Sequence, residues 1–278
     1  MPAVNRAELL FALLVGILQG VLEWLPISSQ GNLSIVTTAV GGVDPVVALD
    51  LALFVQVGTV FSAAAYYRED IADVLSNAPG WRPKAAFDSE NADVTYLVLA
   101  SLVTGVVGIP LYLTLRDAVA GLAGGVFIAV VGGLLVATGL LQRAADSMGF
   151  VGKETPTLLD TLLVGAFQGL TILPGVSRSG TTVSVLLLRG YEGPASLRLS
   201  FLLAIPAGIG AAALVVVSGG GLPGISPLAA GVALASSAIV GYLTIDALMR
   251  FVERVPFWAV CVSLGMLAVV GGLLVAVA

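Results

Sequence analysis

Two short polar segments interrupt the apolar sequence of this chain, and they hold the residue types best suited to chemistry. Gln19 to Gly31 reads QGVLEWLPISSQG, and Gln168 to Gly180 reads QGLTILPGVSRSG. Each segment begins with Gln-Gly, passes through Leu-Pro and ends in a serine-rich turn that glycine closes. The first residues of the two segments are 149 positions apart, and so are their closing glycines. This correspondence indicates an internal repeat.

The second segment has the composition of a phosphate-binding site. The planar guanidinium of Arg178 matches the oxygens of a phosphate group, and the glycines near it let backbone N–H groups approach an anion closely. If a helix begins near Gly180, its N-terminal dipole adds a further favourable term for negative charge. The residues expected to bind the anion beside Arg178 are Ser177, Ser179, Gly180 and Thr181.

The first segment supplies Glu23, the only carboxylate in either segment. Gln19 lies four residues before it, so on a helix the two side chains share one face. This carboxylate could hold a divalent cation, Mg²⁺ or Ca²⁺, or orient a nucleophile. Ser28 and Ser29 follow in the turn, but a serine nucleophile needs a base within hydrogen-bonding reach, and the chain contains no histidine. A purely structural alternative pairs Glu23 with Arg178 as a lock between the repeats.

The elements that must position these residues are membrane helices. Hydrophobic residues make up 58% of the 278 residues and charged residues 10%, with a mean hydropathy of +1.05, whereas an ordinary soluble domain carries about 25% charged residues. This composition excludes a soluble enzyme and gives no sign of a nucleic-acid partner. Six apolar runs approach or exceed the roughly 20 residues that a helix needs to cross a bilayer. They are residues 51–66, 94–115, 124–141, 201–217, 227–249 and 256–277.

The apolar arms beside each polar segment are too short to cross a bilayer singly, which favours re-entrant hairpins over spans. Non-helical backbone at membrane depth must be buried in protein or lined by water, so the two turns should meet inside the bundle. The predicted fold class is an all-α polytopic membrane protein with six transmembrane helices and two re-entrant helical hairpins in inverted-topology repeats. The predicted single domain, 1–278, divides into repeat one, 1–142 with hairpin 9–40, and repeat two, 158–278 with hairpin 158–190.

The distribution of basic residues predicts an orientation. Three spans follow each hairpin, and because three is odd, the second repeat enters the membrane from the opposite side. This topology leaves Arg6 and Arg116 on one side and Arg178 inside, and it gathers the other nine basic residues on the opposite side. Those nine are Arg68, Arg82, Lys84, Arg143, Lys153, Arg189, Arg198, Arg250 and Arg254. The positive-inside rule makes their side cytoplasmic and places both termini outside the plasma membrane.

Several motifs resemble those of the undecaprenyl pyrophosphate phosphatases, the bacitracin-resistance membrane phosphatases. They are QGVLEWLPISSQGN, PGVSRSGTT, the SFLLAIP run from Ser200 to Pro206 and the FVQVGT run from Phe54 to Thr59. The similarity extends over nearly the whole chain. It implies removal of the terminal phosphate of a C55 polyprenyl diphosphate, which regenerates the lipid carrier of cell-envelope synthesis.

The resemblance also implies roles for individual residues. Glu23, Ser29 and Arg178 match catalytic positions of the family, and Glu23 is the expected metal ligand. Gln19 stands where the family usually has its first acid, and Asn32 stands where it has a histidine. Asn32 cannot accept a proton at neutral pH, so three alternatives remain: Ser29 attacks with Glu23 as base, a metal held by Glu23 activates water, or catalysis is slow or absent. The expected substrate-binding residues are Gln19, Ser28, Asn32, Ser177, Ser179, Gly180 and Thr181.

The leading interpretation is therefore a histidine-free polyprenyl diphosphatase whose partners are its lipid substrate and the bilayer. The alternative is a flippase or transporter of polyprenyl phosphate that keeps the anion site with weak or lost catalysis, because inverted repeats with broken helices are also a transporter architecture. A purely structural membrane protein would leave two matched polar turns in costly positions unexplained. The sequence leaves open a homodimer and the length of the lipid.

Overall fold

The computed structural model describes residues 5–146, 152–252 and 255–277, so Arg254 and the repeat boundaries predicted at residues 1 and 278 lie outside the described residues. In this part of the chain there are eleven α-helices, two short 3₁₀ turns and no strand. The helices are α1 Arg6–Leu22, α2 Ser29–Ala39, α3 Pro45–Tyr66, α4 Arg68–Asn77, α5 Ala92–Ala120, α6 Gly124–Asp146, α7 Leu158–Leu170, α8 Arg178–Leu188, α9 Gly193–Gly219, α10 Pro227–Val252 and α11 Phe257–Val277.

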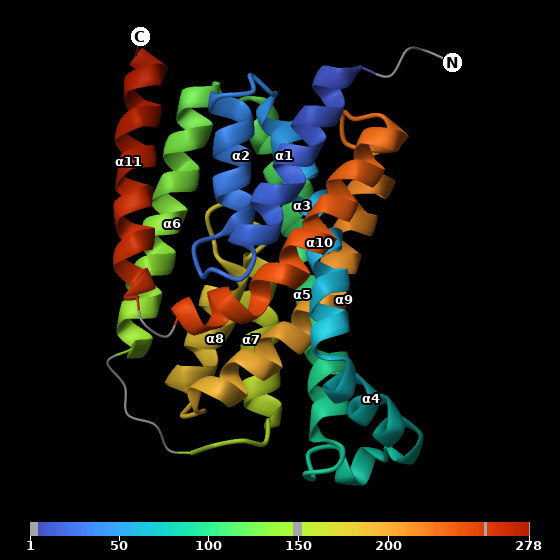
Figure 1. Cartoon of the computed structure of the whole chain (residues 1–278). Helices are drawn as coiled ribbons and strands as arrows, with labels where there is room; N and C mark the ends of the chain where they lie inside the picture. The colour runs from blue at the N-terminus through green and yellow to red at the C-terminus, as the bar shows by residue number, and fades with distance from the viewer. Residues whose placement is uncertain (1–4, 147–151, 253–254, 278) are drawn as a thin grey trace.

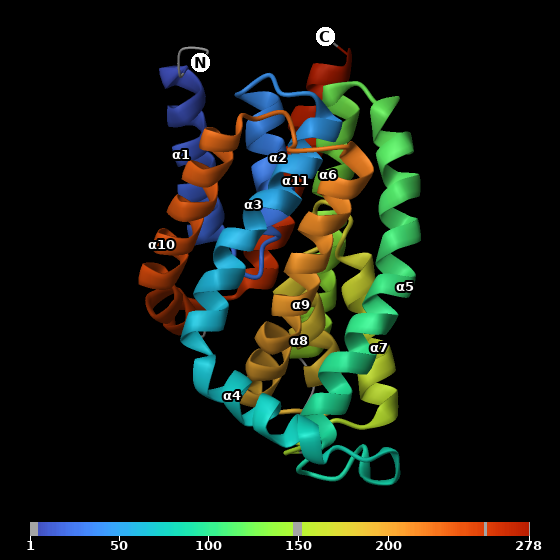
Figure 2. The same ribbon diagram turned by 90° about the vertical axis from the view of Figure 1, so that its right-hand side faces the viewer.

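Six of the described helices are long and apolar enough to cross a membrane: α3, α5, α6, α9, α10 and α11. They coincide with the six predicted runs and extend several of them. The prediction of an all-helical chain with six spans is therefore confirmed. Figures 1 and 2 show most of these helices running roughly along the long axis of the bundle, with the start of α1 and the end of α11 at one end of it and α4 at the other.

Two pairs of shorter helices carry the polar segments. The pair α1 and α2 occupies the half of the bundle near the chain ends, whereas α7 and α8 occupy the opposite half (Figure 1). Each pair is broken where the sequence predicts a break, since α1 ends at Leu22 and α2 begins at Ser29, while α7 ends at Leu170 and α8 begins at Arg178. This arrangement is consistent with re-entrant hairpins, whose depth in a bilayer stays a prediction.

The two breaks touch each other inside the bundle. Ser28 has a left-handed backbone, with φ of 59°, and its Oγ accepts a hydrogen bond of 3.1 Å from the backbone N–H of Gly175. A Cβ added at Gly31 would lie 2.5 Å from that same nitrogen. The Ser28 side chain and the backbone of Gly31 at the start of α2 therefore both contact Gly175, at a distance that no larger residue at Gly31 would permit.

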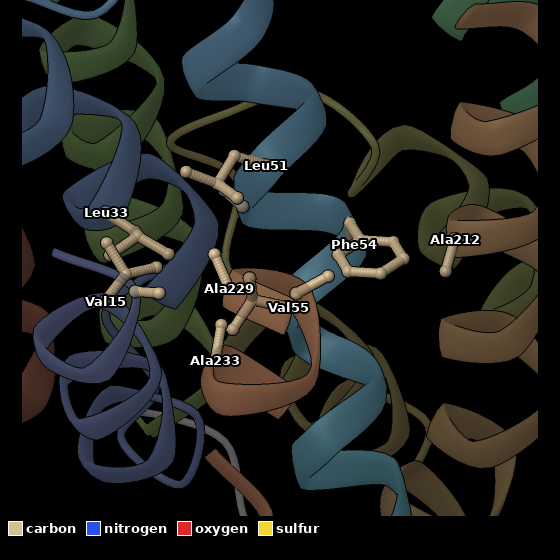
Figure 3. Close-up of a cluster of buried hydrophobic side chains, with 11 residues drawn as sticks. Val15, Leu33, Leu51, Phe54, Val55, Ala212, Ala229 and Ala233 are labelled. Atoms are coloured by element: carbon tan, nitrogen blue, oxygen red, sulfur yellow. The ribbon is translucent and has the colours of Figure 1, made fainter. Parts of the chain in front are cut away.

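A core of buried side chains holds the first hairpin against α3 and α10. Val15 of α1, Leu33 of α2 and Leu51 of α3 pack with Ala229 and Ala233 of α10, and all five are at most 3% exposed (Figure 3). Burying one large aliphatic side chain of this kind stabilises a fold by about 1.5–3 kcal/mol in water; inside a bilayer the gain comes from close packing instead. The small alanines of α10 let the hairpin approach closely, which fixes the height of the first break.

Polar contacts anchor the second hairpin at its open end. Asp160 of α7 is fully buried and accepts hydrogen bonds from Arg189 Nε at 2.6 Å and from the Tyr191 hydroxyl at 2.8 Å. Lys153 forms an ion pair with the same carboxylate, and the Thr157 side chain also donates to it. This network ties the start of α7 to the segment that follows α8.

Candidate functional site

A cavity of about 160 Å³ lies where the two breaks face α3, α5 and α9. Its polar wall comes from the two breaks, with Glu23 and Ser29 on one side and Ser177 and Arg178 on the other. The rest of the lining is mostly small or apolar. The site thus gathers charge and hydroxyl groups in an otherwise apolar bundle, where unsatisfied polar groups are costly.

Glu23 is the centre of the hydrogen-bond network in the first break. Its carboxylate is 5% exposed as a residue and accepts hydrogen bonds from Gln19 Nε2 at 2.6 Å and from Ser29 Oγ at 2.7 Å. Arg178 Nη2 also donates to it across the contact between the hairpins. The ion pair considered as a structural lock is therefore present. Even with this ion pair, Ser29 donates its hydroxyl proton to the Glu23 carboxylate. This is the geometry expected for a serine nucleophile and its base.

Arg178 is placed by the start of α8, of which it is the first residue. Ser177 caps this helix, since its Oγ accepts a hydrogen bond of 3.2 Å from the Gly180 backbone N–H. The half-helix predicted near Gly180 thus begins two residues before it. Arg178 Nη1 is buried and has no hydrogen-bond partner among the described residues. A buried guanidinium nitrogen without a partner is costly, and an anion in the adjoining cavity would satisfy it.

The structure brings only some of the predicted site residues to the cavity. Those that line it are Glu23, Ser28, Ser29, Ser177, Arg178 and Ser179. Gln19 lies behind Glu23, while Gly180 and Thr181 lie within α8 outside the lining. The substrate contact expected for these residues stays a prediction.

Asn32, the residue at the position of the family's histidine, also lies outside the lining. Its amide Nδ2 donates to the Ile27 carbonyl at 2.6 Å and to the Ser28 carbonyl at 3.0 Å. The side chain therefore stabilises the main chain of the break. Its predicted contact with substrate stays untested by this geometry.

Sequence reasoning missed the contributions of the spans. Gln56 of α3, Thr104 of α5 and the small residues Gly105 and Gly210 line the cavity. The available signal was the spacing of Ser101, Thr104, Gly105 and Gly108, which places small and polar residues on one helical face. Without the arrangement of the helices, that face was indistinguishable from a packing surface.

The cavity offers few side-chain ligands for a divalent cation. Within the described ranges no three His, Cys, Asp or Glu side chains cluster as a metal site. Glu23 is the one carboxylate of the cavity lining, although the buried Oε1 of Gln19 has no partner in the described structure. One carboxylate is sufficient for Mg²⁺ when substrate phosphates complete the coordination. The residues present fit a substrate-borne cation better than a permanent one.

Fold and site together define a polytopic helical membrane protein with a buried cavity, lined by Glu23, Ser29 and Arg178, between two broken helix pairs. Residues 12–270 match the sequence model of the family described as Bacitracin resistance protein BacA, and the chain belongs to this family. Its relatives include proteins named Undecaprenyl-diphosphatase. That of Haloarcula marismortui is 54% identical over 96% of this chain and 98% of its own length. That of Methanothrix thermoacetophila is 38% identical over 94% of this chain and 95% of its own length.

Proposed function

We propose that this protein hydrolyses a polyprenyl diphosphate of the undecaprenyl type to polyprenyl phosphate and inorganic phosphate, recycling a lipid carrier. The observation that carries the proposal is the unpartnered Nη1 of Arg178 at a cavity that also holds Glu23 and Ser29. The names of the relatives support hydrolysis over the transport alternative. Water supplies the oxygen of the released phosphate, and the bond between the bridging oxygen and the terminal phosphorus breaks.

Arg178 is the residue that binds the terminal phosphoryl group. Its free Nη1 donates to one phosphoryl oxygen, and Ser177 and Ser179 offer hydroxyls from the same helix start. The N-terminal dipole of α8 adds to this stabilisation. Charge that develops on the phosphoryl oxygens in the transition state is thereby met by donors already in place.

Glu23 is the residue that activates the nucleophile. Its carboxylate is 2.7 Å from Ser29 Oγ and can take the proton of either that hydroxyl or a water in its place. In the first route Ser29 attacks the terminal phosphorus and water later hydrolyses the phosphoserine. In the second route water attacks directly and Ser29 only orients it.

A divalent cation, Mg²⁺ or Ca²⁺, would be held by Glu23 and the substrate oxygens. When bound there, it would neutralise charge on the diphosphate and favour the departure of polyprenyl phosphate. Ser29 Oγ, and Gln19 Oε1 if its side chain turned towards the cavity, would be the further oxygens that could hold it.

The lipid tail lies along α5 and α9. Gly105 and Gly210 line the cavity, and a Cβ added at Gly210 would meet nothing within 4 Å, while one at Gly105 would meet only the tip of Ile109 at 3.9 Å. These glycines are therefore not needed for helix packing. They leave a slot continuous with the phosphate site, as a substrate with a polar head and an apolar chain requires.

The test is phosphate release from a C55 polyprenyl diphosphate by the purified protein in detergent, with Mg²⁺, with Ca²⁺ and with chelator. We expect Arg178→Ala to lower turnover by more than about 10²-fold, as loss of one transition-state donor does. Near-full activity of that variant would contradict the assignment. No release by the unsubstituted protein, with transfer of polyprenyl phosphate across vesicles, would favour transport instead.

The basic end of the bundle is proposed to face the cytoplasm, with both termini outside. Cys261, the only cysteine, is fully buried. Labelling of a single introduced cysteine therefore shows on which side of the membrane that cysteine lies. Ser76→Cys in α4 and Ala120→Cys at the end of α5 are exposed positions at opposite ends of α5. An impermeant thiol reagent applied to intact cells should label only Ala120→Cys. Labelling of Ser76→Cys alone would show that the protein has the opposite orientation.

A further inference from the structure

The five glutamines of the chain differ in their hydrogen bonding. Gln19 donates to Glu23, Gln30 to the Ile172 carbonyl at 3.0 Å, Gln142 to the Pro26 carbonyl at 2.6 Å and Gln168 to the Leu203 carbonyl at 3.4 Å. Gln56 is different, because its carboxamide makes no hydrogen bond with any residue that the structure describes. Apart from the main-chain bonds of the helix, its backbone carbonyl accepts a hydrogen bond from the Thr59 hydroxyl.

Gln56 is buried as a residue, and its unpartnered carboxamide borders the cavity. Gln56 lies midway along α3, is 8% exposed and contributes to the same lining as Glu23 and Arg178. A Cβ added at Gly208 of α9 would lie 3.3 Å from its Nε2, so the side chain extends from α3 towards α9, across the wall of the cavity. An amide that faces a small, mostly apolar cavity without a hydrogen-bond partner costs free energy that a leucine at this position would avoid.

This cost indicates a ligand group that is absent from the protein itself. A polyprenyl chain offers no hydrogen-bonding atom, so the apolar part of the substrate does not satisfy Gln56. Phosphoryl oxygens do, since the carboxamide N–H groups donate and ionised phosphate accepts several hydrogen bonds. The unpartnered Nη1 of Arg178 lines the same space and requires the same kind of acceptor.

We propose that Gln56 is a substrate-binding residue that donates a hydrogen bond to the diphosphate from the side of α3, facing the hairpins. The diphosphate is then held between Arg178 of the second hairpin and Gln56 of the first long helix. This inference rests on the proposed function, because that function identifies the anion as a diphosphate. Inorganic pyrophosphate carries the same group and serves as the probe of binding.

The decisive variant is Gln56→Leu, which keeps the volume of the side chain and removes its hydrogen bonds. We expect it to weaken pyrophosphate binding, measured by calorimetry on the purified protein, by about 10- to 100-fold, as loss of a hydrogen bond to a charged group does. We expect kcat/KM for polyprenyl diphosphate to fall by a similar factor. The melting temperature should stay the same or rise, because an unpartnered polar group has been removed. A structural role for Gln56 would lower the melting temperature instead.

Thr59→Val is the matched control on the same helix. Thr59 is buried one turn from Gln56, bonds only to the main chain and lies outside the cavity lining. Its substitution should leave pyrophosphate affinity unchanged. Gln56→Glu is the second variant, since it adds a negative charge facing the phosphates and should weaken binding more than Gln56→Leu.

Two outcomes would overturn the inference: unchanged pyrophosphate affinity in Gln56→Leu, or no pyrophosphate binding by the unsubstituted protein. Failure of the proposed hydrolysis gives a different result. In that case the unsubstituted protein binds pyrophosphate and releases no phosphate from the lipid, and the affinity of Gln56→Leu still decides the role of Gln56.

Discussion

Glu23 and Arg178 are 155 positions apart in the chain, yet Arg178 Nη2 donates a charge-assisted hydrogen bond to Glu23 Oε1. Both side chains are largely buried, with 3% and 14% of the side-chain surface exposed. The guanidinium has a second terminal nitrogen, Nη1, free for an anion. One nitrogen therefore holds the two repeats together while the other is available for substrate, so the structural and functional interpretations of Arg178 are compatible.

Glu23→Gln should separate binding from turnover. The carboxylate competes with a phosphate for the guanidinium and repels its charge, so its neutralisation should tighten pyrophosphate binding in the presence of chelator. Turnover of polyprenyl diphosphate should fall by about 10²- to 10⁴-fold, because the base is lost. Calorimetry and phosphate release on the same preparation measure both effects. Unchanged turnover would exclude Glu23 as the base.

Ser29→Ala should decide which nucleophile attacks. If Ser29 attacks the terminal phosphorus, the variant loses all activity above background and the unsubstituted protein forms a phosphoserine. If water attacks, Ser29 only orients it through the 2.7 Å contact with Glu23, and activity should fall about 10- to 100-fold without a covalent intermediate. Rapid acid quench with a terminally labelled substrate, followed by mass spectrometry of the protein, distinguishes the two.

Gly210→Leu should fill the proposed slot for the lipid tail. We expect the KM for the long-chain substrate to rise at least about 10-fold, since an added isobutyl group would occupy the space of the chain, while pyrophosphate affinity stays the same. Gly231→Leu is the control, because Gly231 on α10 is also open and exposed but lies outside the cavity lining. Equal effects of the two substitutions would argue against the slot.

Asp160→Asn should destabilise the protein by about 3 kcal/mol, because it removes the buried charge that pairs with the partly exposed Lys153 and Arg189. Burial alone would raise the pKa of Asp160, but hydrogen bonds from Lys153, Thr157, Arg189 and Tyr191 outweigh it and lower the pKa well below its usual value. A lowered pKa in the folded state gives stability that is present above the unfolded value of about 3.9 and is lost as the pH falls below it.

The measurement for Asp160 is the melting temperature in detergent as a function of pH. The gap between the unsubstituted protein and Asp160→Asn should be constant above about pH 5 and should narrow as the pH falls below about 4. Phosphate release at neutral pH and low temperature serves as the control for folding. A gap that widens on acidification would show that Asp160 is not the stabilising carboxylate.

The sequence predicted the framework of this fold well, because helix length and hydropathy are local properties. The six spans, the breaks at Pro26 and Pro174 and the pairing of Glu23 with Arg178 as one alternative all followed from composition and spacing. The pairing could be predicted because the constant offset of 149 residues placed the two polar segments at corresponding positions of a repeat.

The remaining features depend on how helices face one another. Nothing in the FVQVGT run distinguishes Gln56 from a glutamine that bonds to a neighbouring helix, and the difference appears only once α9 is placed beside it. The Asp160 network is likewise assembled from residues on both sides of the second hairpin. Asn32 matched a functional position in the sequence, but its bonds to the Ile27 and Ser28 carbonyls emerge only from the course of the turn.

The contact between Gly31 and Gly175 has a consequence for how such a site can evolve. Because the backbone of Gly31 lies against the backbone of Gly175 and Ser28 Oγ bonds to the same Gly175 N–H, the separation of Glu23 and Arg178 depends strongly on how closely the two main chains approach. Polar side chains that take no part in this approach can then be exchanged without moving the two breaks apart. The proposed anion site of this histidine-free chain therefore keeps its geometry through the close approach of two glycines.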